Sequence, residues 1–267
     1  MKQITFKQII YVALCLILMS ACSVTKKSVM SFSPNSVIAH RGAFKKNNFP
    51  ENSISSLREA IRLGCTGSEF DVRMTADSVL VICHDPVHGG LAIESSTYQD
   101  LKKFPLKNGE ELPTLKQYLL AGKKGNSTTR LVLEIKPSPA GKERGQLIAE
   151  KVVEMVRQCR VERITEYISF DFAILKKVQS LQPSALTHYL NGEKSPDEIK
   201  KEGISGIDYN ISVYRKNPEW IKQAKTLGLV LNVWTVNDPD QLDWCINQSF
   251  DFITTNEPEY LLDRLKK

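Results

Sequence analysis

The sequence predicts an α/β protein built as a (β/α)8 barrel, the TIM-barrel architecture. Strand-like apolar runs alternate along the chain with helical segments, which favours parallel strands joined by helices. Eight such runs occur, and 267 residues, of which 42% are hydrophobic, are enough for one barrel. The predicted strands are residues 36–40, 68–71, 130–136, 167–171, 185–190, 206–210, 229–236 and 250–254.

Helical segments fill the gaps between these strands. Residues 52–63 follow the first strand, with Ile54, Leu57 and Ile61 at helical spacing and Asn52 able to cap the first turn. The other predicted helices are residues 115–120, 146–159, 172–181, 196–202, 218–227, 238–247 and 258–265. Each strand is therefore followed by a helix, as a (β/α)8 barrel requires.

The count of eight strands holds only if residues 72–84 form a hairpin that leaves the barrel after the second strand and returns. Asp77 and Ser78 suit a two-residue turn, and counting outward from that turn places His84 opposite Asp71. Residues 86–113 lie outside the repeat. We expect them to form a short excursion over the mouth of the barrel, with a short helix at 98–103.

The first 22 residues have the features of a bacterial lipoprotein signal peptide. Lys2 and Lys7 precede an apolar run, 9–19, that is short for a membrane span and ends in small residues before Cys22. A plain signal peptide or an uncleaved anchor are the alternatives. We expect a lipidated Cys22, a polar tether over residues 23–35, a folded domain over 36–267, and a location in the bacterial cell envelope facing the periplasm or the surface.

Cysteine content and charge exclude two classes of protein. Cys65, Cys83, Cys159 and Cys245 are widely scattered and three of them lie in strand or helix interiors, so we expect buried thiols rather than a disulfide framework. The formal net charge is +6, and no basic block is interleaved with aromatic residues. Nucleic acid is therefore not an expected partner. The oligomeric state stays open.

Carboxylates gather where the predicted strands end. Glu69 and Asp71 are two residues apart, so their side chains point to the same face of an extended segment. Glu134 ends another strand, and the carboxyl ends of barrel strands meet at one rim. Oxygen ligands alone suit Ca2+ or Mg2+ better than zinc. The alternative is that Glu134 and Lys136 form only a structural ion pair.

Basic residues and histidines accompany these acids. Arg41 can bind two anionic oxygens at once and Lys136 adds a compact positive charge, which together with a cation indicates a phosphate site. His40 and His84 lie at strand or hairpin ends, where they could act as base and acid in a displacement at phosphorus. We expect the two remaining histidines, His88 and His188, to be structural or surface residues.

Six short motifs in a fixed order resemble those of the glycerophosphodiester phosphodiesterases. The resemblance covers about residues 36–262. The motifs are HRG at 40–42, PEN at 50–52, EFDV at 69–72, HD at 84–85, LEIK at 133–136 and WTVN at 234–237.

The resemblance implies a role for each matched residue. Glu69, Asp71 and Glu134 would bind a divalent cation, Ca2+ or Mg2+, while His40 and His84 would be the acid and base. Arg41 would contact the phosphate, with Glu51 and Lys136 in support and Trp234 as an apolar wall against the glycerol. Two departures stand out: Ala76-Asp77-Ser78 replaces Lys-Asp-Gly, and the excursion lacks the usual Thr-Leu-Asp-Arg-Thr-Thr run, which leaves the contacts to the alcohol side undefined.

The expected activity is metal-dependent hydrolysis of a glycerophosphodiester to glycerol 3-phosphate and an alcohol. Either water attacks phosphorus directly, or a glycerol hydroxyl attacks first and water opens the cyclic phosphate. The sequence leaves open which histidine is the base, which cation binds and which alcohol headgroup is preferred. One alternative is a phospholipase of the C or D type acting on intact lipids. Another is a non-catalytic surface lipoprotein that binds phosphorylated ligands.

Overall fold

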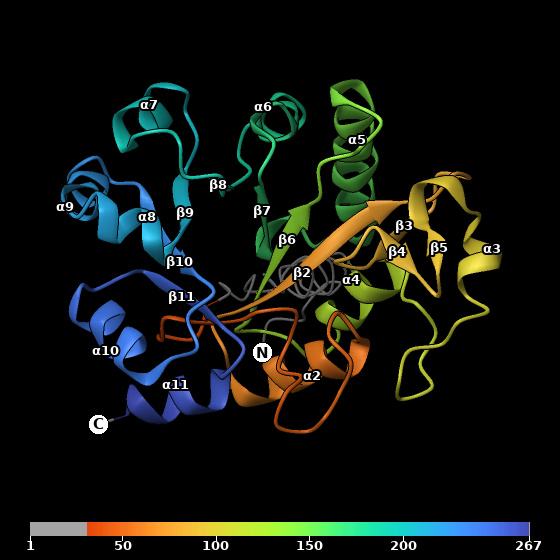
Figure 1. The fold of residues 1–267 in the computed structure, drawn as a ribbon, viewed down its shortest axis with the longest axis horizontal. Coiled ribbons are helices and arrows are strands. Elements are labelled where there is room, and N and C mark those ends of the chain that lie inside the picture. Colours follow the sequence, from red (N-terminus) through yellow and green to blue (C-terminus); the bar gives the residue numbers. More distant parts are fainter. Residues whose placement is uncertain (1–30, 267) are drawn as a thin grey trace, which may run out of the picture. The chain divides into compact units, whose positions relative to one another are not determined.

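Eight parallel strands close into a barrel surrounded by helices (Figure 1). The computed structural model describes residues 31–266. Around the barrel the strands run β1-β11-β10-β9-β8-β7-β6-β2, and pairing of β1 with β2 closes the ring. The predicted (β/α)8 barrel is confirmed. The strands are β1 (Val37–Ala39), β2 (Gly67–Met74), β6 (Arg130–Ile135), β7 (Thr165–Ser169), β8 (Thr187–Tyr189), β9 (Gly206–Asn210), β10 (Val230–Trp234) and β11 (Phe252–Thr255).

The helices match the predicted positions to within a few residues. One expected boundary was wrong: the first helix begins at Ile54 and is capped by Ser53, whose side chain accepts a hydrogen bond from the Ser56 N–H. Asn52 cannot be its cap, because its φ is +58° and its amide binds Asp71. The additional short helix α8 (Ile211–Lys216) was not predicted. The others are α2 (Ile54–Leu63), α4 (Leu115–Lys123), α5 (Lys142–Cys159), α6 (Phe172–Leu181), α7 (Pro196–Lys201), α9 (Glu219–Thr226), α10 (Pro239–Asn247) and α11 (Pro258–Arg264).

The barrel wall has apolar side chains on both of its faces, because strand side chains alternate between them. Outward-facing residues such as Tyr209 and Leu231 pack against the helices. Inward-facing Ile38, Val132 and Ile168 form a smaller cluster inside the barrel. This inner cluster fills the space below the rim where the polar strand ends meet.

The predicted hairpin exists, but its register differs by one residue. Strand β3 (Leu80–Ile82) runs antiparallel to the outer end of β2, with Val72 opposite Ile82, so Asp71 faces Cys83 and not His84. The turn contains three residues, 76–78, closed by a hydrogen bond from the Thr75 N–H to the Val79 carbonyl. A three-residue turn needs a last residue in the left-handed region, and Ser78 supplies it with φ +65°. His84 therefore reaches the barrel mouth from the loop after β3.

The left-handed conformation of Ser78 predicts how this turn tolerates substitution. Ser78→Gly should change the free energy of unfolding by less than about 1 kcal/mol, because relief of left-handed strain is offset by the entropy cost of glycine. Ser78→Val should destabilise by about 1–2 kcal/mol, since a β-branched side chain is poorly compatible with positive φ. Urea unfolding of the two variants checks this, and equal stabilities would contradict the three-residue turn.

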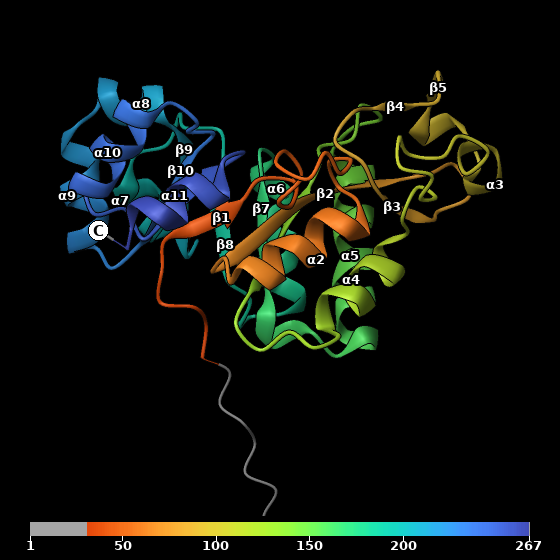
Figure 2. The same ribbon diagram turned by 90° about the horizontal axis from the view of Figure 1, so that it is seen from below.

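Residues 86–113 form an excursion at one end of the domain, far from α9 and α10 (Figure 2). It contains a two-stranded hairpin, β4 (Val87–His88) and β5 (Leu91–Ala92), and the helix α3 (Tyr98–Leu101) falls where a short helix was predicted. Glu94 accepts a 2.8 Å hydrogen bond from Arg144 Nε on α5 and another from the Ser138 hydroxyl. These contacts attach the excursion to the barrel beside the loop that follows β6.

The four cysteines within the described residues are free thiols, as expected: Cys65, Cys159 and Cys245 are buried and Cys83 is partly buried. No helix between residues 31 and 266 is long and apolar enough to cross a membrane. The predicted signal peptide and lipidated Cys22 lie outside the described residues. At the end of the predicted tether, the Phe32 ring lies 3.8 Å from the guanidinium carbon of Arg130.

Candidate active site

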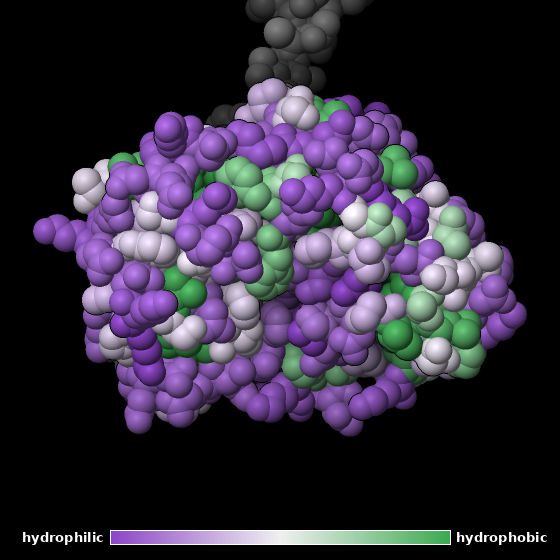
Figure 3. Space-filling view, turned by 45° about the horizontal axis from the view of Figure 1, so that its top comes forward, coloured by the Kyte–Doolittle hydropathy of each residue, from purple (hydrophilic) through white to green (hydrophobic). Residues whose placement is uncertain are grey.

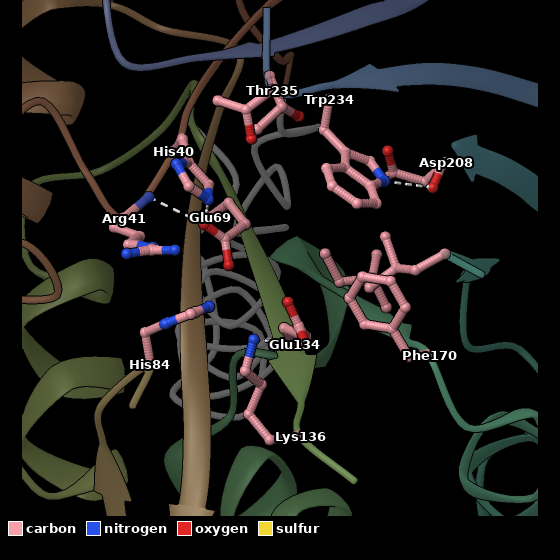
Figure 4. A pocket seen from close by; sticks show the side chains of 13 residues that line it. His40, Arg41, Glu69, His84, Glu134, Lys136, Phe170, Asp208, Trp234 and Thr235 are labelled. Atoms are coloured by element: carbon pink, nitrogen blue, oxygen red, sulfur yellow. Dashed lines mark hydrogen bonds and ion pairs between the residues drawn. The ribbon is translucent and has the colours of Figure 1, made fainter. Parts of the chain in front are cut away.

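A cavity of about 120 Å3 opens at the carboxyl ends of the barrel strands (Figure 4). In (β/α)8 barrels this is the end where catalytic residues gather. Seven of the nine predicted site residues line the cavity, and the other two, Asp71 and Glu51, contact residues that line it. The lining residues are His40, Arg41, Glu69, His84, Glu134, Lys136, Ile168, Phe170, Leu190, Asp208, Trp234, Thr235 and Thr254.

The three predicted ligand carboxylates form one buried cluster. Glu69, Asp71 and Glu134 each offer an oxygen, and these oxygens lie within 4.8 Å of one another. Glu69 and Asp71 share one face of β2, and Glu134 lies beside Asp71 on the neighbouring strand β6. Strand alternation and parallel register therefore assemble a group that could hold a metal ion.

Burial sets the electrostatics of this cluster. It raises the pKa of Glu69 well above the usual range, and the charges of Asp71 and Glu134 add to that effect. Burial is also the main reason that the pKa of Glu134 is raised to about 7. Burial opposes ionisation of Asp71 as well, but Lys136 and Asn52 lower its pKa. Without a cation, burial therefore favours the protonated forms of Glu69 and Glu134, whereas Asp71 stays ionised beside Lys136.

Lys136 is the cation within this cluster. Its Nζ lies 3.0 Å from Asp71 Oδ1 and 2.8 Å from Glu134 Oε1. Lys136 and Glu134 therefore do form the ion pair that the structural alternative predicted. It does not account for Glu69, whose Oε1 is buried and has no hydrogen-bond partner in the part of the chain described. An unpartnered buried oxygen beside two further carboxylates fits a hard cation.

Asn52 holds Asp71 in place, a role that the sequence did not reveal. Its amide nitrogen donates a 2.8 Å hydrogen bond to Asp71 Oδ2, and its amide oxygen accepts one of 3.1 Å from the Asp71 N–H. Partners of this kind orient ligand carboxylates. Two residues of the PEN motif therefore support the site: Glu51 contacts Arg41, and Asn52 contacts Asp71.

His40 follows β1 and is largely buried. Its Nδ1 lies 2.7 Å from Asn256 Oδ1, an atom that can only accept, so Nδ1 carries the proton and Nε2 has the lone pair. That Nε2 is 3.9 Å from Glu69 Oε2. Burial, followed by the charge of Arg41, lowers the pKa of His40 to about 4. The imidazole is therefore neutral, with its free nitrogen facing the carboxylate cluster.

His84 lies on the same side of the cavity as Arg41 and is more exposed than His40, with 38% of its side chain accessible against 19% (Figure 4). Its Nδ1 is 2.8 Å from Asp85 Oδ1. Arg73, on the face of β2 that also carries Asp71, donates hydrogen bonds of 2.9 and 2.8 Å from two nitrogens to the His84 carbonyl. Arg73 thereby fixes the backbone that carries the second histidine.

Arg41 has a left-handed backbone, φ +54°, that turns its N–H toward Glu69 Oε2 at 2.8 Å. Its Nη1 donates to Glu51 Oε2 at 2.6 Å and its Nε lies 3.7 Å from Asp71 Oδ2. Glu51 thus supports the arginine. Gly42 is required next, because a Cβ there would lie 2.4 Å from the Ser56 hydroxyl oxygen.

The opposite side of the cavity is mainly apolar. The Trp234 indole donates a 2.7 Å hydrogen bond to the Asp208 carbonyl and packs edge to face against Phe170, with ring centroids 5.5 Å apart. Sequence reasoning found Trp234 but missed Phe170 and Asp208. The strand pattern carried one signal for Asp208. Its neighbour Tyr209 faces outward toward the helices, so the Asp208 side chain faces into the barrel.

A family model for the glycerophosphoryl diester phosphodiesterase family matches residues 40–260. A glycerophosphodiester phosphodiesterase of Caldanaerobacter subterraneus is 28% identical over 247 residues, which are 86% of this chain and 98% of the relative.

Solved structures show the same similarity. A glycerophosphodiester phosphodiesterase of Parabacteroides distasonis is 43% identical with a TM-score of 0.84, covering 88% of this chain and 98% of that one. A phosphodiesterase of Oleispira antarctica, solved with its product sn-glycerol-3-phosphate, shares the fold at 22% identity and a TM-score of 0.76, covering 87% and 97%. The matched motifs, the barrel and the comparisons agree: the chain belongs to the glycerophosphoryl diester phosphodiesterase family.

Proposed function

We propose that this enzyme hydrolyses glycerophosphodiesters to glycerol 3-phosphate and an alcohol in a reaction that depends on Ca2+ or Mg2+. The observation that carries the proposal is one small cavity lined by three elements of phosphodiester chemistry. These are a cluster of buried carboxylates, two cationic side chains and two histidines. The family supports the substrate class.

The carboxylate cluster suits a hard divalent cation. Its donors are oxygens only, and one buried oxygen of Glu69 lacks a partner among the residues described. A bound cation would supply charge stabilisation for a phosphoryl oxygen. Arg41 and Lys136 lie at the same cavity, where they would hold the remaining anionic oxygens. Glu51 keeps Arg41 in that position.

The two histidines differ in ways that divide the acid and base roles. His40 presents an unprotonated Nε2 toward the cluster, so we assign it as the base that takes a proton from the attacking hydroxyl group. His84 is more exposed and paired with Asp85, so we assign it as the acid that gives a proton to the departing alcohol oxygen. The assignment serves equally for attack by water and by a glycerol hydroxyl.

A coupled assay for glycerol 3-phosphate tests this function. Glycerophosphocholine, glycerophosphoethanolamine and glycerophosphoglycerol are supplied with Ca2+, with Mg2+ or with excess chelator. Release of glycerol 3-phosphate only in the presence of a cation supports the proposal. Binding of these diesters without turnover would instead indicate a non-catalytic surface lipoprotein.

An intact phospholipid is tested beside these diesters with release of choline or phosphocholine as the readout, because its hydrolysis yields no free glycerol 3-phosphate. Val87 and Phe104 on the excursion are 48% and 39% exposed. Figure 3 shows apolar residues gathered on the right of a mostly hydrophilic surface, the side where the excursion lies in Figure 1. Faster hydrolysis of phosphatidylcholine than of glycerophosphocholine would favour the phospholipase alternative.

We further propose that the protein is anchored in the bacterial cell envelope through lipid on Cys22. The support is the sequence pattern of residues 1–22. Cys22→Ser should move the protein from the membrane fraction to the soluble fraction, because the acyl chains would be lost. Immunoblotting of fractions from cells that express each form checks this. Unchanged membrane association would point to the apolar segment itself as the anchor.

A further inference from the structure

The cavity has one charged side and one apolar side, and the apolar side contains a single carboxyl group. Figure 4 shows Arg41 and His84 on one side, and Trp234, Asp208 and Phe170 on the other. Nothing in the proposed chemistry at phosphorus uses Asp208. Its presence among aromatic and aliphatic neighbours therefore needs a separate explanation.

Asp208 lies on β9 with its side chain directed into the barrel, since its neighbours Ile207 and Tyr209 pack outward against the helices. It is only 1% exposed, yet it lines the cavity, and its Oδ1 is buried without a hydrogen-bond partner in the described structure. Burial raises the pKa of this carboxyl well above its usual range, opposed by the Asn232 side chain and reinforced by Glu134 and Glu166.

A buried oxygen without a partner is costly unless something occupies the cavity beside it. Asn232 lies opposite Asp208 on the neighbouring strand β10, yet Oδ1 stays without a hydrogen-bond partner among the described residues. A neutral carboxyl can both donate and accept, which matches an alcohol hydroxyl. The cavity of about 120 Å3 has room for a small polyol group beside this carboxyl.

We propose that Asp208 recognises a hydroxyl of the substrate's glycerol end. In this arrangement the glyceryl carbons lie between Phe170 and Trp234, and the phosphate faces Arg41 and Lys136. The alcohol headgroup then points toward His84 and solvent. The inference rests on the proposed function, and it adds a residue of the cavity's apolar side that recognises a glycerol hydroxyl.

Ligand binding tests this separately from catalysis. Isothermal titration calorimetry with Mg2+ compares glycerol 3-phosphate with n-propyl phosphate, which has the same carbon chain and phosphate but no hydroxyls. The wild type should bind glycerol 3-phosphate about 10- to 100-fold more tightly, because propyl phosphate leaves the buried carboxyl unpaired. Asp208→Leu should reduce that preference to about 3-fold or less, with little change for propyl phosphate.

Two further variants separate recognition from structure. Asp208→Asn keeps a donor and an acceptor and should keep most of the preference. Glu166→Gln changes another buried carboxyl inside the barrel, one that accepts from Arg130 Nε at 2.8 Å, and should behave as the wild type.

The outcomes are distinct. Equal weakening of both ligands in Asp208→Leu, an unchanged preference in that variant, or no preference in the wild type would each overturn the inference. An intact preference in a protein that hydrolyses no glycerophosphodiester would overturn the proposed function and support the role of Asp208.

Discussion

Glu134→Gln and Asp71→Asn are expected to lower cation affinity by about 100-fold or more and to bring hydrolysis close to background. Each change removes one negative charge from a cluster whose oxygens lie within 4.8 Å of one another. It also leaves Lys136, which contacts both residues, with fewer acidic partners. Calorimetric titration with Ca2+ and Mg2+, together with glycerol 3-phosphate release, measures both effects.

The dependence of cation affinity on pH gives the same experiment a second readout, because protons compete with the cation for the carboxylates. The pKa of Glu134 without a cation is about 7, so this group is increasingly protonated below pH 7. A cation must displace that proton, and the affinity of the wild type should therefore rise as the pH increases through 7. Glu134→Gln removes the titrating group and should flatten this part of the dependence.

Asn52→Gly is the matched control, since it keeps all three carboxylates and tolerates the positive φ of this position. Losing both hydrogen bonds to Asp71 should weaken cation binding by about 10- to 100-fold, with most turnover restored at saturating cation. Full activity of the wild type in excess chelator would contradict the metal assignment altogether.

The hairpin shows which details a sequence pattern can and cannot predict. Alternation of strands and helices was enough for the barrel, because each βα unit carries its own local signal. The register of β3 was wrong because Ala76, Asp77 and Ser78 suit two- and three-residue turns alike. One contact that holds the observed turn comes from elsewhere in the chain: Asp77 accepts a hydrogen bond from the N–H of Tyr98 in the excursion, in addition to one from the nearby Thr75 hydroxyl.

The site shows the same limit. Residues that would touch phosphate or metal, such as Arg41 and Glu69, stand in short motifs with a distinctive composition. Asn52, Arg73 and Asn256 act on those residues across 11 to 216 positions of sequence. The folded barrel and its hairpin bring such pairs together, and the sequence alone does not reveal them. Asn52 lay within a recognised motif, but its most obvious use, as a helix cap, competed with its actual contact to Asp71.

His40→Ala and His84→Ala are each expected to lower turnover by about 100- to 10,000-fold while cation affinity stays within a few-fold of the wild type. Neither ring belongs to the carboxylate cluster, although His40 Nε2 lies 3.9 Å from Glu69. Steady-state kinetics at saturating cation and calorimetric titration of the cation measure the two quantities. His88→Ala is the control, because that ring contacts the Phe104 carbonyl in the excursion at 2.7 Å.

A leaving group that needs no proton separates the two histidines. A glyceryl diester of p-nitrophenol expels a stable phenolate, so loss of a general acid should matter little for it, whereas loss of a general base should matter as before. His84→Ala should therefore recover most of its activity on this substrate and His40→Ala should not. Recovery in His40→Ala alone would reverse the assignment. Loss of cation binding in either variant, with turnover restored at saturating cation, would make that histidine a ligand instead.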